Sequence, residues 1–311
     1  MTNSITPVRV IAFPGAPNLP TFAAQKLGFF EAAGLSVDVS ITPSSVFQAE
    51  KMSEGAFDIA FTAFDNVVAY SEGQGAKPGI DPDYCVVAGA TQLELGFIVS
   101  PDIKTHADVK GKSIALDALA TGFAFALIDM LSRADVPVAS YQIAPVGATP
   151  QRWQSVKAGD HAGTITIEPF TSIAVKSGFH LLDVSTRIYP AYQGGIIAAR
   201  RSYLRDHAQI VTKFLVAYLK GLAWTLDPAN VEAAEALLLE KMPEIQPAAA
   251  KAVMKSLLSP KSGLTPGAEI VPEGMDKVLA LRSQFGPSKV ELKGFQKYLE
   301  LDCLKAAQAS I

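Results

Sequence analysis

The chain has 311 residues and a formal net charge of −3, and it is 49% apolar against 18% charged. This balance excludes a disordered chain, and the length allows one large domain or two ordinary ones. No uninterrupted apolar run approaches the roughly 18 residues that a membrane-spanning helix requires. Lysine and arginine are scattered rather than gathered in a basic stripe, so nucleic acid is not an expected partner.

The chain has only two cysteines, Cys85 and Cys303, which are too few for a thiolate metal site or a disulfide framework. We expect two buried free thiols rather than one bridge, because free cysteine is among the most buried residue types. The first residues lack the basic segment followed by an apolar one that marks a signal peptide. A cytosolic protein and a sequence that begins after a removed leader both stay open.

Strands and helices alternate in the first part of the chain. A buried strand is predicted over 8–13, and the prolines of the next segment, 14–17, end it because proline donates no hydrogen bond to a sheet. A helix with apolar residues three to four apart follows and closes at Gly34. Further elements are a strand over 37–41, a helix over 43–55, a strand over 57–61, a helix ending at Gly73, and an interrupted strand over 84–99. Such alternation predicts a mainly parallel sheet with right-handed crossovers.

The pattern restarts near Lys110 and ends in helices. Strands are predicted over 114–116, 141–146, 162–167 and 181–184, with helices from Gly122, Thr149 and Phe170 and a returning strand over 192–198. Five helices follow, over 202–225, 230–241, 247–258, 271–285 and 292–307. Helices without strands cannot form a sheet of their own, so we expect these five to pack on the first of two lobes, the one that contains the first predicted sheet. The predicted fold is therefore two-lobed α/β, with lobe 1 over 1–92, lobe 2 over 93–193, and a return strand and C-terminal helices over 194–311.

Strand-to-helix loops are the expected ligand-binding segments, because ligands bind beyond the carboxyl ends of the strands in open α/β sheets. The candidate loops are 13–21, 43–45, 62–66 and 119–123. Each precedes a helix whose first N–H groups lack partners and carry partial positive charge. Hydroxyl groups there either contact a ligand or only cap their own helices; they belong to Ser44, Ser45, Thr62 and Thr121.

Aromatic and acidic residues near these loops have two interpretations each. Phenylalanine rings there either stack on an aromatic ligand or, as is commoner for a single ring, pack in the core; they are Phe13, Phe64, Phe123 and Phe170. Glu168, next to Pro169, either pairs with a basic group of a ligand or lies at a solvated edge. For Asp65, a helix N-cap is favoured over a ligand contact.

No catalytic set emerges from the sequence. The histidines lack the HExxH spacing of a zinc site, and no GxSxG elbow or Walker loop occurs. Neither cysteine falls on a candidate loop. We therefore predict a protein that is not an enzyme, with no catalytic residue, metal or cofactor. The alternative is an enzyme on the same scaffold with Glu168 or His161 as acid or base.

Several segments together resemble the NMT1/THI5-like group of periplasmic-type solute-binding proteins, relatives of the taurine, alkanesulfonate and thiamine-precursor binders of ABC importers. The segments are LGFFEAAGLSVDV (27–39), SEGAFDIAFTAFDNV (53–67), VKGKSIALDALATGFAFAL (109–127) and AGDHAGTITIEPF (158–170), and the resemblance spans about residues 8–225. It implies a type II periplasmic binding protein fold whose two lobes close on a ligand by hinge motion. It also implies a monomer that works in the periplasm with an ABC importer permease.

The resemblance further implies a set of ligand contacts in the matching loops. They are Phe13, Gly15, Asn18, Leu19, Ser44, Ser45, Thr62, Phe64, Asp65, Asn66, Thr121, Gly122, Phe123, Glu168 and Gln193. Because the candidate loops contain no Arg or Lys, a neutral or weakly charged heteroaromatic ligand such as a pyrimidine-type vitamin precursor is favoured, with a sulfonate, taurine or an aromatic acid as the alternative. The group's pyrimidine synthases carry a cysteine-rich motif and its sulfinate-cleaving enzymes a first-lobe cysteine, both of which this chain lacks, so the enzymatic alternatives are disfavoured.

Overall fold

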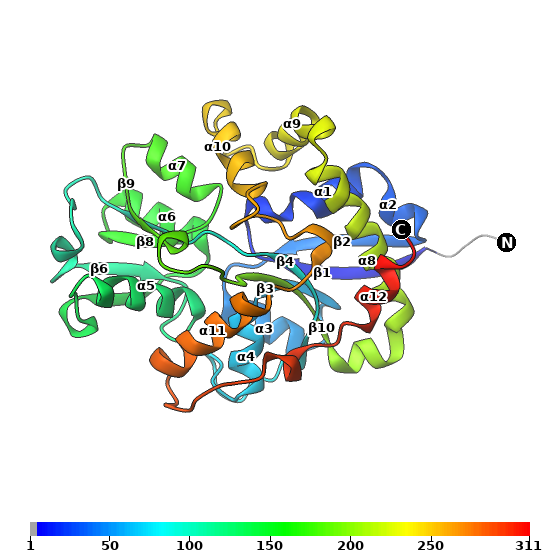
Figure 1. Cartoon of the computed structure of the whole chain (residues 1–311), viewed down its shortest axis with the longest axis horizontal. Coiled ribbons are helices and arrows are strands. Elements are labelled where there is room, and N and C mark those ends of the chain that lie inside the picture. The colour runs from blue at the N-terminus through cyan, green and yellow to red at the C-terminus, as the bar shows by residue number, and fades with distance from the viewer. Residues whose placement is uncertain (1–4) are drawn as a thin grey trace.

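A computed structural model describes residues 5–311; residues 1–4, and with them part of the segment considered for a leader, lie outside the described residues. The molecule has two lobes side by side, each built around a five-stranded sheet flanked by helices (Figure 1). We call the lobe of the first sheet lobe 1 and the other lobe 2. The predicted two-lobed α/β fold is confirmed.

The sheet of lobe 1 has the strand order β2-β1-β3-β10-β4. Its strands are β1 (Thr6–Ala12), β2 (Leu35–Ile41), β3 (Ile59–Ala63), β4 (Tyr84–Thr91) and β10 (Gly195–Arg200). The strands β1, β2 and β3 are parallel, whereas β10 runs antiparallel to both β3 and β4. A strand from the last third of the chain thus completes a sheet begun at the N-terminus.

The sheet of lobe 2 has the strand order β7-β6-β8-β5-β9. Its strands are β5 (Gly96–Val99), β6 (Ser113–Leu116), β7 (Gln142–Pro145), β8 (Gly163–Thr166) and β9 (His180–Val184). Again one strand, β5, runs antiparallel to its neighbours β8 and β9, while β6 is parallel to β7 and β8. Both exceptions, β5 and β10, are the first strands after a crossing between lobes. They begin where the carboxyl ends of the parallel strands lie, so they run the opposite way.

The helices of the two lobes follow the predicted strand-to-helix pattern with one correction. Lobe 1 contains α1 (Leu19–Lys26), α2 (Phe29–Ala32), α3 (Ser45–Ser53) and α4 (Phe64–Ser71); lobe 2 contains α5 (Gly122–Arg133), α6 (Thr149–Ala158) and α7 (Phe170–Lys176). The single helix predicted to run to Gly34 is two helices. Gly28 between them has a φ of 71°, a left-handed conformation that ends a helix and that glycine adopts without strain.

The C-terminal helices are α8 (Arg201–Leu226), α9 (Val231–Lys241), α10 (Pro247–Leu257), α11 (Pro272–Phe285) and α12 (Asp302–Gln308). As predicted, α8, α9 and α12 pack on lobe 1. Two others reach lobe 2 as well, because α10 contacts α7 and α11 contacts α5. The helix predicted over 292–307 is wrong in its first half, where a 3-10 turn (Phe295–Tyr298) precedes α12.

The core of lobe 1 contains a cluster of aromatic rings. Phe30 stacks on Phe214 with ring centroids 5.2 Å apart, and the ring centroids of Phe61 and Tyr218 are 5.6 Å apart.

The backbone leaves lobe 1 after β4 and returns to it with β10. We propose the boundaries 1–92, 93–193 and 194–311 on this basis.

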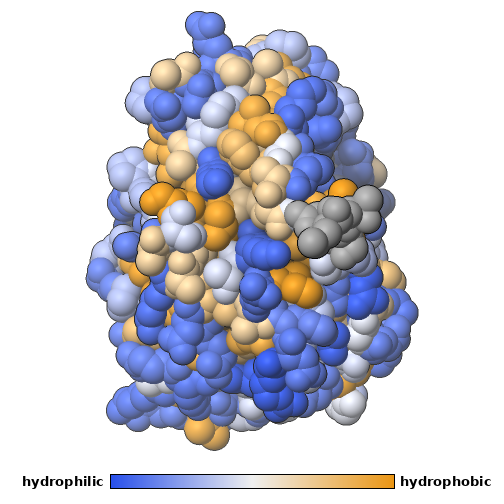
Figure 2. Space-filling view, turned by 90° about the vertical axis from the view of Figure 1, so that its right-hand side faces the viewer, coloured by the Kyte–Doolittle hydropathy of each residue, from blue (hydrophilic) through white to orange (hydrophobic). Residues whose placement is uncertain are grey.

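The C-terminus lies on the side of lobe 1 that faces away from lobe 2 (Figure 1). Figure 2 shows this side, which is mostly hydrophilic with hydrophobic residues gathered near its middle. Among residues 5–311, no helix combines the length and apolar character needed to cross a bilayer. The two thiols, Cys85 and Cys303, are buried and free, in line with the prediction.

Candidate ligand-binding site

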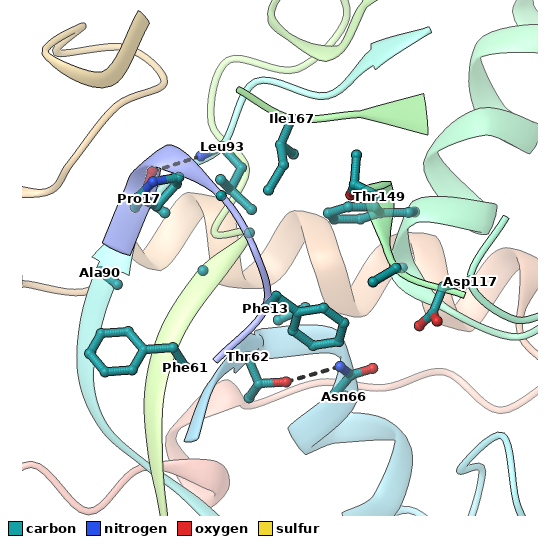
Figure 3. A pocket seen from close by; sticks show the side chains of 18 of the residues that line it. Phe13, Pro17, Phe61, Thr62, Asn66, Ala90, Leu93, Asp117, Thr149 and Ile167 are labelled. Carbon is teal, nitrogen blue, oxygen red and sulfur yellow. Dashed lines mark hydrogen bonds between the residues drawn. The ribbon is translucent and has the colours of Figure 1, made fainter. Parts of the chain in front are cut away.

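A cavity of about 90 Å³ lies between the lobes and is lined by loops from both (Figure 3). Lobe 1 supplies the β1–α1 loop and the end of β3, lobe 2 supplies the loops after β6 and β7, and the two crossing segments complete it. The lining residues are Phe13, Gly15, Pro17, Asn18, Phe61, Thr62, Ala63, Asn66, Ala90, Thr91, Leu93, Asp117, Thr121, Gly122, Phe123, Ala148, Thr149, Arg152, Ile167, Gly194, Gly195 and Ile196.

The structure brings more than half of the predicted ligand-binding residues to this cavity. They are Phe13, Gly15, Asn18, Thr62, Asn66, Thr121, Gly122 and Phe123. In Figure 3 the ring of Phe13 lies near the middle of the lining, with Thr62 and Asn66 close by and Asp117 and Thr149 facing it from lobe 2. Two amide groups of lobe 1 are already paired, since Asn66 Nδ2 donates to Thr62 Oγ1 at 3.0 Å and Asn18 Nδ2 donates to the Phe13 carbonyl at 2.8 Å. The lining is otherwise largely apolar.

Other predicted residues lie outside the lining because the fold uses them elsewhere. Leu19 and Phe64 are fully buried in the core of lobe 1, and Phe64 packs edge-on against Tyr298. The Ser44 hydroxyl caps its own helix, accepting the N–H of Phe47 at 3.1 Å. Ser45 contributes only its backbone N–H, which donates to Asp117 across the cleft.

Gln193 is buried and stabilises the return crossing rather than the cavity wall. Its Nε2 donates to the carbonyls of Thr91 and Gly195 at 3.2 and 2.9 Å, and its Oε1 accepts the N–H of Val271 at 2.8 Å. All its amide groups are therefore occupied by backbone. Phe170, also considered, packs with Trp153 in a small core of lobe 2.

Asp65 is neither the helix cap nor the ligand contact considered for it. Ala63 is the N-cap residue of α4, and Asp65 in the first turn pairs with Arg282 of α11. The carboxylate accepts two hydrogen bonds, at 2.7 Å from Nε and 2.6 Å from Nη2. Both side chains are essentially inaccessible to solvent. Arg282 comes from the last helices, so a pattern confined to the first lobe gives no sign of the pair.

Arg152, which the candidate loops did not include, is the one arginine or lysine among the lining residues. It lies in α6, 1% exposed, where its Nη2 donates to Thr149 Oγ1 at 2.8 Å and its guanidinium lies 5.8 Å from the Phe123 ring. Its Nε has no hydrogen-bond partner among residues 5–311. Burial lowers the pKa of Arg152 to about 10, opposed by the negative charge of Asp117.

The sequence contains a signal that places Arg152 at the cleft. The segment 146–149 also leads from a parallel strand into a helix, like the four chosen loops. A residue in the first turn of that helix is placed toward the cleft. The cavity therefore contains a cationic side chain that lies outside the four candidate loops.

The lobes touch directly around the cavity. The Ser45 N–H donates to the two Asp117 carboxylate oxygens at 3.1 and 3.3 Å. Backbone hydrogen bonds add two more links, from Ala16 N to Glu168 O at 3.0 Å and from Ala148 N to Pro43 O at 2.9 Å. The structure is thus a closed arrangement of the lobes.

The acid–base residues of the enzymatic alternative stand apart from the cavity. The Glu168 carboxylate accepts the Ser172 hydroxyl at 2.8 Å and the Ser172 N–H at 3.2 Å, and His161 Nδ1 lies 2.8 Å from Ser113 Oγ. Neither side chain lines the cavity. Among residues 5–311, no group of three or more His, Cys, Asp and Glu side chains is placed to hold a metal ion.

Replacing Glu168 by Gln should stabilise the protein slightly at neutral pH. Burial raises the pKa of Glu168 above its ordinary 4.5, against the hydrogen bonds from Ser172. Stability therefore falls as pH rises from 4.5 through the folded-state pKa, and Glu168→Gln removes that loss. We expect the Tm to rise by roughly 1–3 °C at pH 7 and to be unchanged at pH 4. A gain of equal size at both pH values would contradict this explanation.

Comparison with known proteins places the chain in a family. The family model described as NMT1/THI5 like matches residues 17–231. No curated protein sequence matches the chain. Among solved structures, a protein from Bordetella bronchiseptica RB50 is similar with a TM-score of 0.81 and 20% identity, covering 98% of each chain.

Two further structures have descriptions that name ligands. The alkanesulfonate-binding protein SsuA from Xanthomonas axonopodis pv. citri, bound to MOPS, has a TM-score of 0.74 and 14% identity and covers 95% of this chain and 98% of its own. The periplasmic nitrate-binding protein NrtA from Synechocystis PCC 6803 has a TM-score of 0.80 and 12% identity and covers 99% of this chain and 89% of its own. At such low sequence identities, the structural similarity shows a shared fold and no more. The match of the family model over most of the chain shows that this protein belongs to the NMT1/THI5-like family.

Proposed function

We propose that this protein is a solute-binding protein that encloses a small molecule between its lobes and delivers it to an ABC importer permease. Family membership and the interlobe cavity support this role, as do the descriptions of similar structures as alkanesulfonate-binding and nitrate-binding proteins. The proposal makes the protein a monomer that acts in the periplasm. It assigns no chemical step to the cavity.

The observation that carries the ligand class is the buried guanidinium of Arg152. A buried cation without an anionic partner is destabilising by several kcal/mol. A ligand carboxylate or sulfonate offers oxygens that match the planar fork of an arginine, and its negative charge compensates the guanidinium. We infer that the ligand carries one negative charge next to Arg152.

The rest of the lining indicates an apolar body for this ligand. Rings of Phe13, Phe61 and Phe123 and the side chains of Leu93 and Ile167 form most of it. Such surfaces are stabilised by contact with aliphatic or aromatic carbon. An aromatic or short aliphatic acid, or the corresponding sulfonate, is therefore preferred over the neutral pyrimidine that the sequence favoured.

A thermal-shift screen with charge-matched pairs tests the proposal. Benzoate and benzenesulfonate should raise the Tm, whereas benzamide, which has nearly the shape of benzoate without its charge, and neutral aminopyrimidines should not. A ligand at 100 times its Kd adds about 2.7 kcal/mol to the free energy of unfolding. Stabilisation by the neutral compounds alone would reject the anion, and a flat response across a broad panel would reject the binding role.

A further inference from the structure

Two opposite charges line the cavity from the same lobe without pairing. Asp117 follows β6 and Arg152 lies in α6 after β7, and these parallel strands are neighbours that end side by side at Leu116 and Pro145. Both residues therefore stand at the same edge of the lobe 2 sheet. Within residues 5–311, Arg152 donates only to Thr149, and the Asp117 carboxylate turns away to lobe 1.

The lobe 1 partner of Asp117 is the start of α3. There the Ser44 hydroxyl already serves the N–H of Phe47, and the N–H of Ser45 donates to Asp117. The first N–H groups of a helix lack intrahelical partners and carry partial positive charge, so a carboxylate is stabilised at this place. Since Asp117 and Ser45 belong to different lobes, the contact exists only when the lobes are together.

We propose that Asp117 is a specificity-determining residue that makes lobe closure conditional on a negatively charged ligand. When the lobes separate, Asp117 loses the N–H of Ser45 and pairs with Arg152 in its own lobe. An arriving anion takes its place on Arg152, and the released carboxylate binds the start of α3 and draws the lobes together. The inference rests on the proposed function in taking the ligand to be an anion.

The exchange discriminates by charge as well as by shape. A neutral molecule that fits the cavity leaves the pair of Asp117 and Arg152 intact, so the lobes stay apart around it. An anion of the same shape breaks the pair and closes them. A permease that accepts only the closed form thus receives only anions, because a ligand shifts an equilibrium only by its differential affinity for the two states.

The test needs no ligand, because Arg152→Met frees Asp117 in the way that an anion would. We would strip the full chain of bound small molecules by dialysis from denaturant and measure the radius of gyration by small-angle X-ray scattering. The wild type should be mainly open and Arg152→Met mainly closed, with a radius smaller by roughly 1 Å and an open-to-closed ratio lowered at least about 100-fold. Adding Asp117→Asn should reopen the variant. Lys157→Met, the same loss of charge at an exposed position of α6, is the matched control and should behave as wild type.

Any other outcome contradicts the proposal that an anion replaces Asp117 on Arg152. Equal radii for the wild type and Arg152→Met would show that Arg152 does not hold Asp117 back, and a double variant that stays closed would show that Asp117 is not the group that docks. Circular dichroism and cooperative urea unfolding establish that each variant is folded, and Arg152→Gln gives a second reading if the methionine variant misfolds. Since no ligand is added, the result is independent of the ligand screen, and either can fail alone.

Discussion

Replacing Asp65 by Asn should lower the free energy of unfolding by about 3–5 kcal/mol, the usual loss when one member of a buried ion pair is removed. Arg282 would keep its charge in a site where its side chain is 0% exposed. Its remaining partners are the Gln74 Oε1 at 3.3 Å and the Ala120 carbonyl at 3.1 Å. These neutral groups, with the Phe125 ring 4.9 Å away, do not replace a carboxylate.

Urea unfolding followed by circular dichroism measures this loss. The exposed pair of Glu291 and Lys293, 2.8 Å apart, gives the control, and Glu291→Gln should change the free energy of unfolding by less than about 1 kcal/mol. The double variant Asp65→Leu with Arg282→Met should be more stable than Asp65→Asn, because no buried charge is left. Equal losses for Asp65→Asn and Glu291→Gln would show that the pair contributes no more than a surface contact.

Arg152→Met should abolish anion binding and at the same time make the ligand-free protein more stable. In the closed arrangement the pKa of Arg152 is near 10 instead of 12.5, so the buried guanidinium costs on the order of 3 kcal/mol at all pH values below 10, and the pair with Asp117 in the open form returns only part of this cost. The sign follows from linkage, because a base with a lowered folded-state pKa regains this stability only as pH rises from 10 to 12.5. Methionine removes the charge, and we expect a gain of about 1–3 kcal/mol.

Calorimetry with the best anion of the screen, together with urea unfolding of the ligand-free protein, checks both parts. Binding should weaken at least about 100-fold, the loss expected for a buried charge-assisted contact. Lys157→Met should leave the affinity unchanged. A destabilised Arg152→Met that still binds the anion would assign the arginine to the core of lobe 2 instead of the site.

The positions of proline and glycine made most of the fold predictable. Proline and glycine separate nearly every element, and α6 begins and ends where its Thr-Pro start and Gly159 place it. Local signals failed where a glycine inside a helical pattern took a left-handed conformation, as Gly28 does. They also failed for α10 and α11, whose contacts with lobe 2 depend on how the lobes meet.

The site was predictable where a residue's place follows from its own loop. Phe13 and Thr121 follow strands whose carboxyl ends meet the cleft, Thr62 lies at the end of such a strand, and all three line the cavity. Residues whose role depends on a distant partner were not predictable. Asp65 binds an arginine 217 positions later in the chain, and the Ser45 N–H finds a carboxylate in the other lobe. Polar groups on a loop can thus be hydrogen-bonded to residues that are distant in the sequence and that come close only in the folded protein.

The two strands that run against their sheets have a consequence for how the protein opens. Because β5 and β10 begin at the cleft, the crossings that precede them form the back wall of the cavity, where Thr91, Leu93, Gly194 and Gly195 are all lining residues. A side chain on Gly194 would meet Leu93 at 2.7 Å, and one on Gly195 would meet Thr91 at 2.6 Å. Opening of the lobes by bending at these crossings would therefore change the binding site itself. A molecule in the cavity would contact the segments that join the lobes as well as the loops on either side of them.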